Sequence, residues 1–421
     1  MRTGRLALVL MLIAAASLSG QAPASSWPQW GGPDRNFTIS APALSRAWPA
    51  EGPKQIWSRA LGEGHSAIAE DRGRLYTLYR PLGLLSLVRR SQEEVIAAFD
   101  AATGRTIWEH RYAAPTGELN FEAGAGPHST PLVAGGLVFA TSSLNQLFAL
   151  ERDSGRLVWS RDLRREYGAR LADRGYTCSP LAYGDTVIVT AGGRPGQAAM
   201  AFRQKTGELA WKGGDFDPSP ASPLVIDVQG QPQLVVLGGD RVAGLDPASG
   251  RLLWSHPHVT QFGLNISPPV WTGDELFISS AYNGGSRLLR LSREGDKTEV
   301  SEAWFTSRMR VHFGSVLRIG DHYYGSSGDF GPAFLVGVEA KTGRVAWQDR
   351  SFARAQLVGT GETALLLDED GTLAIVRFSP EGVTTVARAP LMEATSWTPP
   401  TVVGSRVYLR DRENMVAVSV E

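Results

Sequence analysis

The chain has 421 residues, of which 43% are hydrophobic and 20% charged, and 42 Lys and Arg balance 42 Asp and Glu. This composition excludes a disordered protein and a collagen-like fibre, and the balanced charge gives no reason to expect nucleic acid as a partner. A single cysteine, Cys178, excludes an intramolecular disulfide, a multi-cysteine zinc site and a CxxC redox pair. The 47 glycines, 25 prolines and 12 tryptophans favour many short strands joined by turns.

The first residues, 1–24, have the layout of a secretory signal peptide. Arg2 and Arg5 precede an apolar run over 6–18, and Ala22-Pro23-Ala24 fits the small-x-small pattern of a cleavage site. The run is shorter than the ~20 residues that a membrane-spanning helix needs, and no later segment approaches that length. We therefore expect a signal peptide over 1–24, no transmembrane segment in the mature chain, and a periplasmic or secreted protein. An uncleaved N-terminal anchor is the alternative interpretation.

A repeat runs through most of the remaining chain. Its first copy, residues 98–108, reads Ala-Phe-Asp-Ala-Ala-Thr-Gly-Arg-Thr-Ile-Trp, and in each of five full copies a glycine precedes a tryptophan by four residues. Two further copies are degenerate, because residues 295–304 form a longer turn and residues 382–386 end in Val386 instead of Trp. The five full copies end at Trp108, Trp159, Trp211, Trp254 and Trp347.

Each repeat predicts four strands. An apolar segment, often preceded by Ser-Pro as at Ser179-Pro180, is followed by a tight turn such as Gly184-Asp185 and by a second β-rich segment such as 186–189. A third segment ends near the Ala-x-Asp, and a fourth ends at the Trp. Such turns between alternating apolar segments are typical of β-hairpins. Four antiparallel strands in every segment of about 40–50 residues predict one blade of a β-propeller.

The two ends of the repeat region are each incomplete. The last unit has three predicted strands and stops after Ala417-Val418-Ser419, where a turn and a Trp strand should follow. The strand that ends at Trp57 has no three strands before it. We therefore predict an all-β, eight-bladed β-propeller over 54–421, in which the N-terminal strand completes the last blade, preceded by an N-terminal extension over 25–53. Closure removes open sheet edges, and we expect a monomer.

The tryptophans of the repeat are predicted to dock one blade onto the next. An indole buries a large apolar area and has an N–H that needs an acceptor, so a backbone carbonyl of the neighbouring blade would suit it. Gly in the preceding turn would adopt a positive φ without a clash at Cβ. The predicted docking residues are Trp57, Trp108, Trp159, Trp211, Trp254, Trp304 and Trp347.

The motif Ala-x-Asp-x-x-Thr-Gly-x-x-x-Trp resembles the tryptophan-docking repeat of the quinoprotein-type eight-bladed propellers. The resemblance covers roughly residues 48–421, and the segment 27–36 resembles the opening of exported PQQ-binding-like β-propeller repeat proteins. It implies one of two functions. One branch of this superfamily contains the dehydrogenases of alcohols and glucose that depend on pyrroloquinoline quinone (PQQ). The other contains BamB, an outer-membrane assembly lipoprotein that acts as a non-catalytic scaffold.

The enzyme branch fits this sequence less well than the scaffold branch. Many of its members hold the quinone beneath a vicinal Cys–Cys disulfide, whereas Cys178 stands alone. They also bind Ca²⁺ through carboxylate and amide oxygens, and no residue here can be matched to those positions. BamB fits in length, although Gln21 stands where a lipoprotein signal has its lipid-bearing Cys. We assign no catalytic, cofactor-binding or metal-binding residue and predict a non-catalytic binding or scaffolding propeller. A divergent dehydrogenase that uses PQQ and calcium is the alternative.

The connections that enter each new blade are longer than most other turns and lie on one face of the predicted ring, where binding is most often found. Residues just before the first strands would surround the mouth of the central channel on this face. A metal site, a mouth for a small ligand or peptide, and a plain polar lining are the alternatives, and Cys178 is expected to be a buried filler. We expect a protein partner or a small ligand on this long-loop face. The candidates are His65, His128, Cys178, Asn265, His312 and Trp397.

One of these connections is basic. Leu163, Tyr167 and Leu171 recur every four residues among five arginines, which indicates a short amphipathic turn. The arginines would recruit an anionic ligand or an acidic partner, or else lie on a solvated loop. They are Arg161, Arg164, Arg165, Arg170 and Arg174.

Overall fold

The computed structural model describes residues 26–39, 47–49, 51–82, 90–122 and 126–420. The predicted signal peptide over 1–24 lies outside these residues, as does part of the extension predicted over 25–53. In the part of the chain that is described, no helix is long and apolar enough to cross a membrane. The described residues contain one α-helix, α1 (Leu163–Tyr167), and all other extended regular structure is β.

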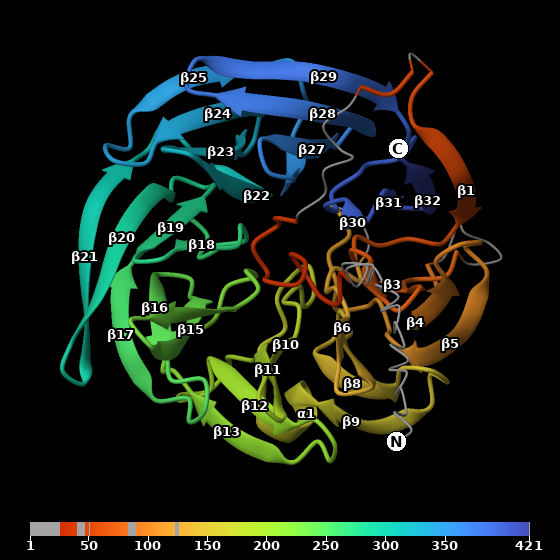
Figure 1. Cartoon of the computed structure of the whole chain (residues 1–421). Helices are drawn as coiled ribbons and strands as arrows, with labels where there is room; N and C mark the ends of the chain where they lie inside the picture. Colours follow the sequence, from red (N-terminus) through yellow and green to blue (C-terminus); the bar gives the residue numbers. More distant parts are fainter. Residues whose placement is uncertain (1–25, 40–46, 50, 83–89, 123–125, 421) are drawn as a thin grey trace, which may run out of the picture.

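Eight four-stranded antiparallel sheets are arranged around a ring, which confirms the predicted eight-bladed β-propeller (Figure 1). In each sheet, strands that are consecutive in the repeat are hydrogen-bonded neighbours. The first half of the ring consists of blade 1 with β2 (Ala69–Asp71), β3 (Arg74–Tyr79), β4 (Glu93–Asp100) and β5 (Thr106–Ala113), blade 2 with β6 (Leu132–Ala134), β7 (Leu137–Thr141), β8 (Gln146–Glu151) and β9 (Leu157–Asp162), blade 3 with β10 (Leu181–Tyr183), β11 (Thr186–Thr190), β12 (Ala199–Arg203) and β13 (Leu209–Gly213), and blade 4 with β14 (Leu224–Val228), β15 (Gln231–Leu237), β16 (Arg241–Leu245) and β17 (Leu252–Pro257).

The second half of the ring includes the two degenerate repeats, which form the outer hairpins of blades 5 and 7. It consists of blade 5 with β18 (Val270–Thr272), β19 (Glu275–Ser280), β20 (Gly285–Glu294) and β21 (Lys297–Thr306), blade 6 with β22 (Val311–Ile319), β23 (His322–Ser327), β24 (Phe334–Glu339) and β25 (Val345–Asp349), blade 7 with β26 (Ala355–Gly359), β27 (Thr363–Asp368), β28 (Thr372–Ser379) and β29 (Gly382–Pro390), and blade 8 with β30 (Thr401–Val403), β31 (Arg406–Arg410), β32 (Asn414–Ser419) and β1 (Lys54–Ala60).

The N-terminal strand completes the last blade, as predicted. β1 pairs antiparallel with β32, and Trp57 lies opposite Ala417. The hydrogen-bonded order β1-β32-β31-β30 therefore joins the two ends of the repeat region in one sheet. Because the two ends of the repeat region pair there, each of the eight sheets has four strands.

The prediction that each fourth strand ends at its tryptophan is wrong. β5 continues past Trp108 to Ala113, which lies opposite Glu93 in the ladder with β4. The residues after Trp108 alternate between exposed and buried positions, as in a strand with one buried face, and they remain paired with β4. The strand therefore extends beyond the end of the repeat motif.

Six of the predicted docking tryptophans donate a hydrogen bond to a backbone carbonyl of the next blade. Trp108 is an example: its Nε1 lies 3.0 Å from the Arg152 carbonyl. Gly155 in the same turn has φ +69°, and a Cβ there would lie 2.5 Å from the Trp108 ring, so this position requires glycine for two reasons. The others are Trp57, Trp159, Trp211, Trp304 and Trp347.

Trp254, whose neighbour is blade 5, differs from the other six. Its Nε1 donates to Gln233 Oε1 in its own blade at 2.6 Å. Gln233 Nε2 in turn donates to Thr298 Oγ1 in blade 5 at 2.7 Å. The buried Gln233 side chain therefore replaces the missing carbonyl and connects the two blades.

The N-terminal segment 26–39 lies across the middle of the ring (Figure 1). Trp27 forms a backbone bridge with Glu70 of blade 1, and Arg35 Nη1 donates to the Pro180 carbonyl of blade 3 at 3.0 Å. Near its other end, the segment bridges in parallel to Gly359 of blade 7. The extension thus ties together blades that are distant in the ring.

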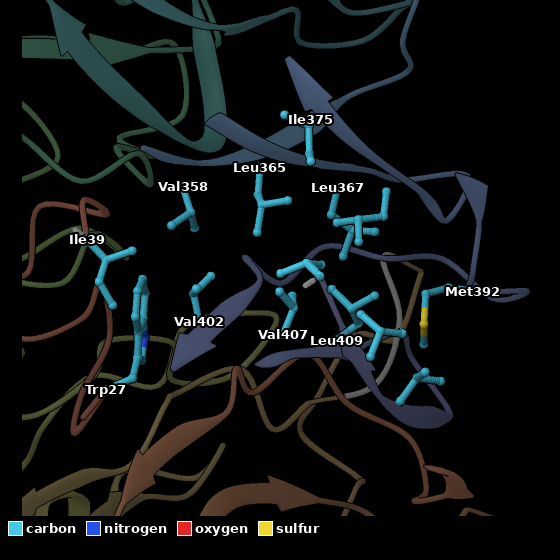
Figure 2. Close-up of a cluster of buried hydrophobic side chains, with 14 residues drawn as sticks. Trp27, Ile39, Val358, Leu365, Leu367, Ile375, Met392, Val402, Val407 and Leu409 are labelled. Atoms are coloured by element: carbon cyan, nitrogen blue, oxygen red, sulfur yellow. The ribbon is translucent and has the colours of Figure 1, made fainter. Parts of the chain in front are cut away.

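The side chains of this segment belong to the core. Trp27 is 1% exposed and packs with Ile39 against the cluster between blades 7 and 8, which includes Val358 and Val402 (Figure 2). Burying a tryptophan and an isoleucine contributes several kcal/mol, so the packing of this segment stabilises the propeller.

Candidate functional site

The innermost strands begin on one face of the ring, and we call the area enclosed by their first residues the channel mouth. Six residues were predicted to surround it. Four of them, His65, His128, His312 and Trp397, belong to one continuous row of ring contacts. Cys178 and Asn265 take no part in this row of described side chains.

The row, which we call the aromatic chain, begins with stacked histidines. The centroid of His65 lies 5.6 Å from that of His128 and 4.7 Å from that of Trp397. Phe313 continues the row, 5.2 Å from Trp397 and 4.9 Å from His312. These residues precede or begin the innermost strands of blades 1, 2, 6 and 8, so the aromatic chain links the neighbouring blades 8, 1 and 2 to blade 6.

Tyr282 extends the aromatic chain into solvent at blade 5. Its ring lies 4.9 Å from that of His312, and its Oη is 2.7 Å from His312 Nε2. Tyr282 also contacts Phe330 at 5.2 Å and Phe262 at 5.3 Å, and these two phenyl rings are 75% and 54% exposed. Val259, in the same connection as Phe262, is 63% exposed. The aromatic chain, completed by Phe262 and Phe330, therefore ends in clustered apolar surface, which is a mark of interaction sites.

The imidazoles of the aromatic chain are neutral at neutral pH. Burial, followed by the charges of Arg410 and Arg174, lowers the pKa of His128 to about 4. Burial, followed by the charge of Arg354, lowers the pKa of His312 to about 4 as well. These rings therefore present π faces rather than positive charges.

Positive charge at the mouth comes from arginines instead. Arg410 is fully buried, and its Nη1 donates to two backbone carbonyls at 2.6 Å. Burial lowers the pKa of Arg410 to about 9, which leaves it charged at neutral pH. Arg354 lies 5.6 Å from the Phe313 centroid and pairs with Glu369, whose Oε2 also accepts a hydrogen bond from Trp397 Nε1 at 3.0 Å.

Cys178 and Asn265 hold blades together. Cys178 Sγ donates to the Ala221 carbonyl at 2.9 Å, and burial raises the pKa of this thiol to about 11. A thiol in that state is a poor nucleophile. Asn265 is fully buried, and its Nδ2 donates to the Gly238 carbonyl at 2.7 Å.

The side chains at the mouth do not fit a quinone held by calcium. Ca²⁺ takes six to eight oxygen ligands, mostly carboxylates and carbonyls. The described residues contain no group of three or more His, Cys, Asp and Glu that could hold a metal ion. The nearby carboxylates of Glu369 and Asp329 are already paired with Arg354 and Arg310. We therefore derive no chemical step through PQQ or calcium.

Several residues of the mouth were not predicted. Phe313 directly follows His312, and a search for aromatic residues beside the candidates would have found it. Phe262, Tyr282 and Phe330 lie in connections whose meeting point depends on how blades 5 and 6 pack. Their exposure could not be predicted from the sequence pattern.

Fold and repeat together define the class of the chain: an eight-bladed β-propeller with tryptophan-docking repeats. The model of the family described as outer membrane protein assembly factor BamB matches residues 92–349. The chain therefore belongs to this family, whose PQQ-like propeller repeat is shared with quinoprotein dehydrogenases.

Both BamB proteins and quinoprotein dehydrogenases match the sequence. Outer membrane protein assembly factor BamB of Yersinia pestis is 25% identical over 54% of this chain and 55% of its own length. The 1-butanol dehydrogenase (quinone) of Thauera butanivorans is 30% identical over 32% of this chain and 23% of its own length. The matched region thus spans about a quarter to half of these curated relatives.

Solved structures show the same fold. BamB from Moraxella catarrhalis has a TM-score of 0.60 at 17% identity and covers 87% of this chain, with 98% of its own chain matched. Quinohemoprotein alcohol dehydrogenase from Comamonas testosteroni has a TM-score of 0.61 at 13% identity, over 94% of this chain and 80% of its own. At these identities the likeness concerns the fold alone.

Proposed function

We propose that this chain is an exported propeller that binds a partner at the channel mouth and has no redox activity of its own. The observation that carries the proposal is the composition of the mouth: stacked neutral rings, an exposed cluster of phenyl groups, and arginines. Such side chains bind by stacking, apolar contact and charge. The proposed export rests on the predicted signal peptide over 1–24 and on the BamB relatives.

The alternative is a divergent PQQ-dependent dehydrogenase, which is supported by the quinoprotein relatives and by the shared fold. Purified mature protein, incubated with PQQ and Ca²⁺ and passed over a gel-filtration column, distinguishes the two. We expect no quinone absorbance to co-elute with the protein and no reduction of an artificial dye with alcohols or sugars. Co-elution together with dye reduction would overturn the proposal.

A further inference from the structure

Arg174 differs from three of the other four arginines of the basic connection. Three of them are ion-paired: Arg161 with Glu166, Arg164 with Glu118, and Arg170 with Asp217. Arg165, in α1, is also exposed, and its side chain has no ion pair with a described residue. Arg174 is exposed and has neither an ion pair nor a hydrogen bond to any described residue.

The guanidinium of Arg174 lies at the channel mouth. Burial is the main cause of the shifted pKa values of His128, Tyr282 and His312, and the charge of Arg174 acts on all three: it adds to the lowering at both histidines and opposes the raising at Tyr282. These residues belong to three different blades. Because the interaction between charges weakens with distance and is screened beyond about 10 Å, the Arg174 side chain must lie near all three residues.

Two arginines at the mouth are not ion-paired with a described carboxylate. Arg174 and Arg410 have no ion pair among the described residues, whereas the carboxylates of Asp329 and Glu369 are paired with arginines. Asp411 is near Arg410, but its carboxylate accepts hydrogen bonds from the backbone amides of its own turn. Of the residues outside the described ranges, Glu421 alone is acidic. An anionic group from another molecule would complement the exposed charge of Arg174.

The extent of the aromatic chain favours an extended peptide over one small planar ligand. Six successive ring contacts lead from His128 to Phe330, each with centroids 4.7–5.6 Å apart. An extended peptide rises about 3.3 Å per residue and points alternate side chains to the same side. Several residues of a peptide would therefore contact the aromatic chain.

We propose that the mouth binds an extended segment of a partner protein in which an acidic side chain pairs with Arg174 and flanking apolar or aromatic side chains pack on the aromatic chain. This inference rests on the proposed binding function and specifies the chemistry of the partner. An internal acidic residue is favoured over a C-terminal carboxylate, because Arg174 lies near both His128 and Tyr282, which are toward opposite ends of the aromatic chain, and a chain end would leave part of the aromatic chain uncovered.

A library of random peptides displayed on phage tests the proposal with the wild-type protein, Arg174→Gln and Arg170→Gln. Arg170 is the matched control, because it lies in the same connection but is already paired with Asp217. We expect the wild type and Arg170→Gln to enrich peptides that have an Asp or Glu between aromatic or apolar residues. Arg174→Gln is expected to lose the acidic preference and to keep the apolar one.

An enriched peptide and its Glu→Gln form, measured by fluorescence anisotropy, give the magnitude. The acidic form should bind the wild type at least about 10-fold more tightly, and added salt should reduce this difference because Arg174 is exposed. Equal binding of the two forms, enrichment without acidic residues, or equal effects of Arg170→Gln and Arg174→Gln would each overturn the inference. Co-elution of PQQ with dye reduction would overturn the proposed function as well, so the two failures are distinguishable.

Discussion

A buried histidine shows how single residues set the pH response of this propeller. His258 is fully buried between blades 4 and 5, and Arg287 Nε donates to its Nδ1 at 2.9 Å. The other nitrogen, Nε2, must then carry the hydrogen and donate to Ser280 Oγ at 2.9 Å. Burial, followed by the charge of Arg287, lowers the pKa of His258 to about 3. A proton added to this ring would displace the arginine.

Protonation of His258 should destabilise the fold in acid. Its pKa is lower in the folded than in the unfolded chain, so between pH 6.5 and 3 the unfolded chain binds more protons, and the free energy of unfolding falls as the pH falls. Urea denaturation gives the free energy of unfolding at pH 7 and at pH 4.5. From the higher to the lower pH, this free energy should fall by about 2 kcal/mol more in the wild type than in His258→Gln. The same loss in both proteins would show that His258 does not titrate in this way.

At the scale of the blade, the repeat specifies both where each blade lies in the sequence and how it contacts the next blade. The tryptophan and the glycine of the motif meet across each ordinary blade junction, so the motif predicted both the strands and the contact between blades. The closure of the ring was predictable for a similar reason. The last unit of the repeat region has three strands and lacks a fourth, and the strand at Trp57 is a fourth strand without the other three. The position of segment 26–39 was not predictable, because Arg35 bonds to a carbonyl 145 residues away and the segment has no strand pattern of its own.

Two glycines of blade 2 allow the blade junction to be tested. Gly155→Ala would place a Cβ 2.5 Å from the Trp108 ring, whereas Gly136 has a similar φ of +80° with nothing within 4 Å of an added Cβ. Gly136→Ala should lower the free energy of unfolding by about 1 kcal/mol through backbone strain alone. Gly155→Ala should lower it by about 2 kcal/mol more, because Trp108 must move. Equal losses in urea denaturation would show that Trp108 does not depend on this close contact.

Across the whole molecule, the two faces of the ring differ in chemistry. The chain has no net charge, but unpaired arginines and exposed phenyl rings gather at the channel mouth, and segment 26–39 bridges the other ends of the innermost strands of blades 1 and 7. His65, His128, His312 and Trp397 could be predicted to lie near one another, because each precedes or begins an innermost strand. Arg174 could be predicted only as one of five arginines, since its isolation depends on which carboxylates the fold brings to the others.

The most direct test of binding at the mouth places a photo-crosslinking amino acid at Phe330 or, in a second protein, at Lys341, which lies in the exposed β24–β25 turn of the opposite face. Each variant is irradiated in the cells from which the chain comes, and the joined peptides are identified by mass spectrometry. Binding at the mouth predicts a discrete adduct from Phe330, joined to an acidic, apolar-rich segment of one protein, and none from Lys341. Adducts from Lys341 alone, or the same adducts from both positions, would contradict it.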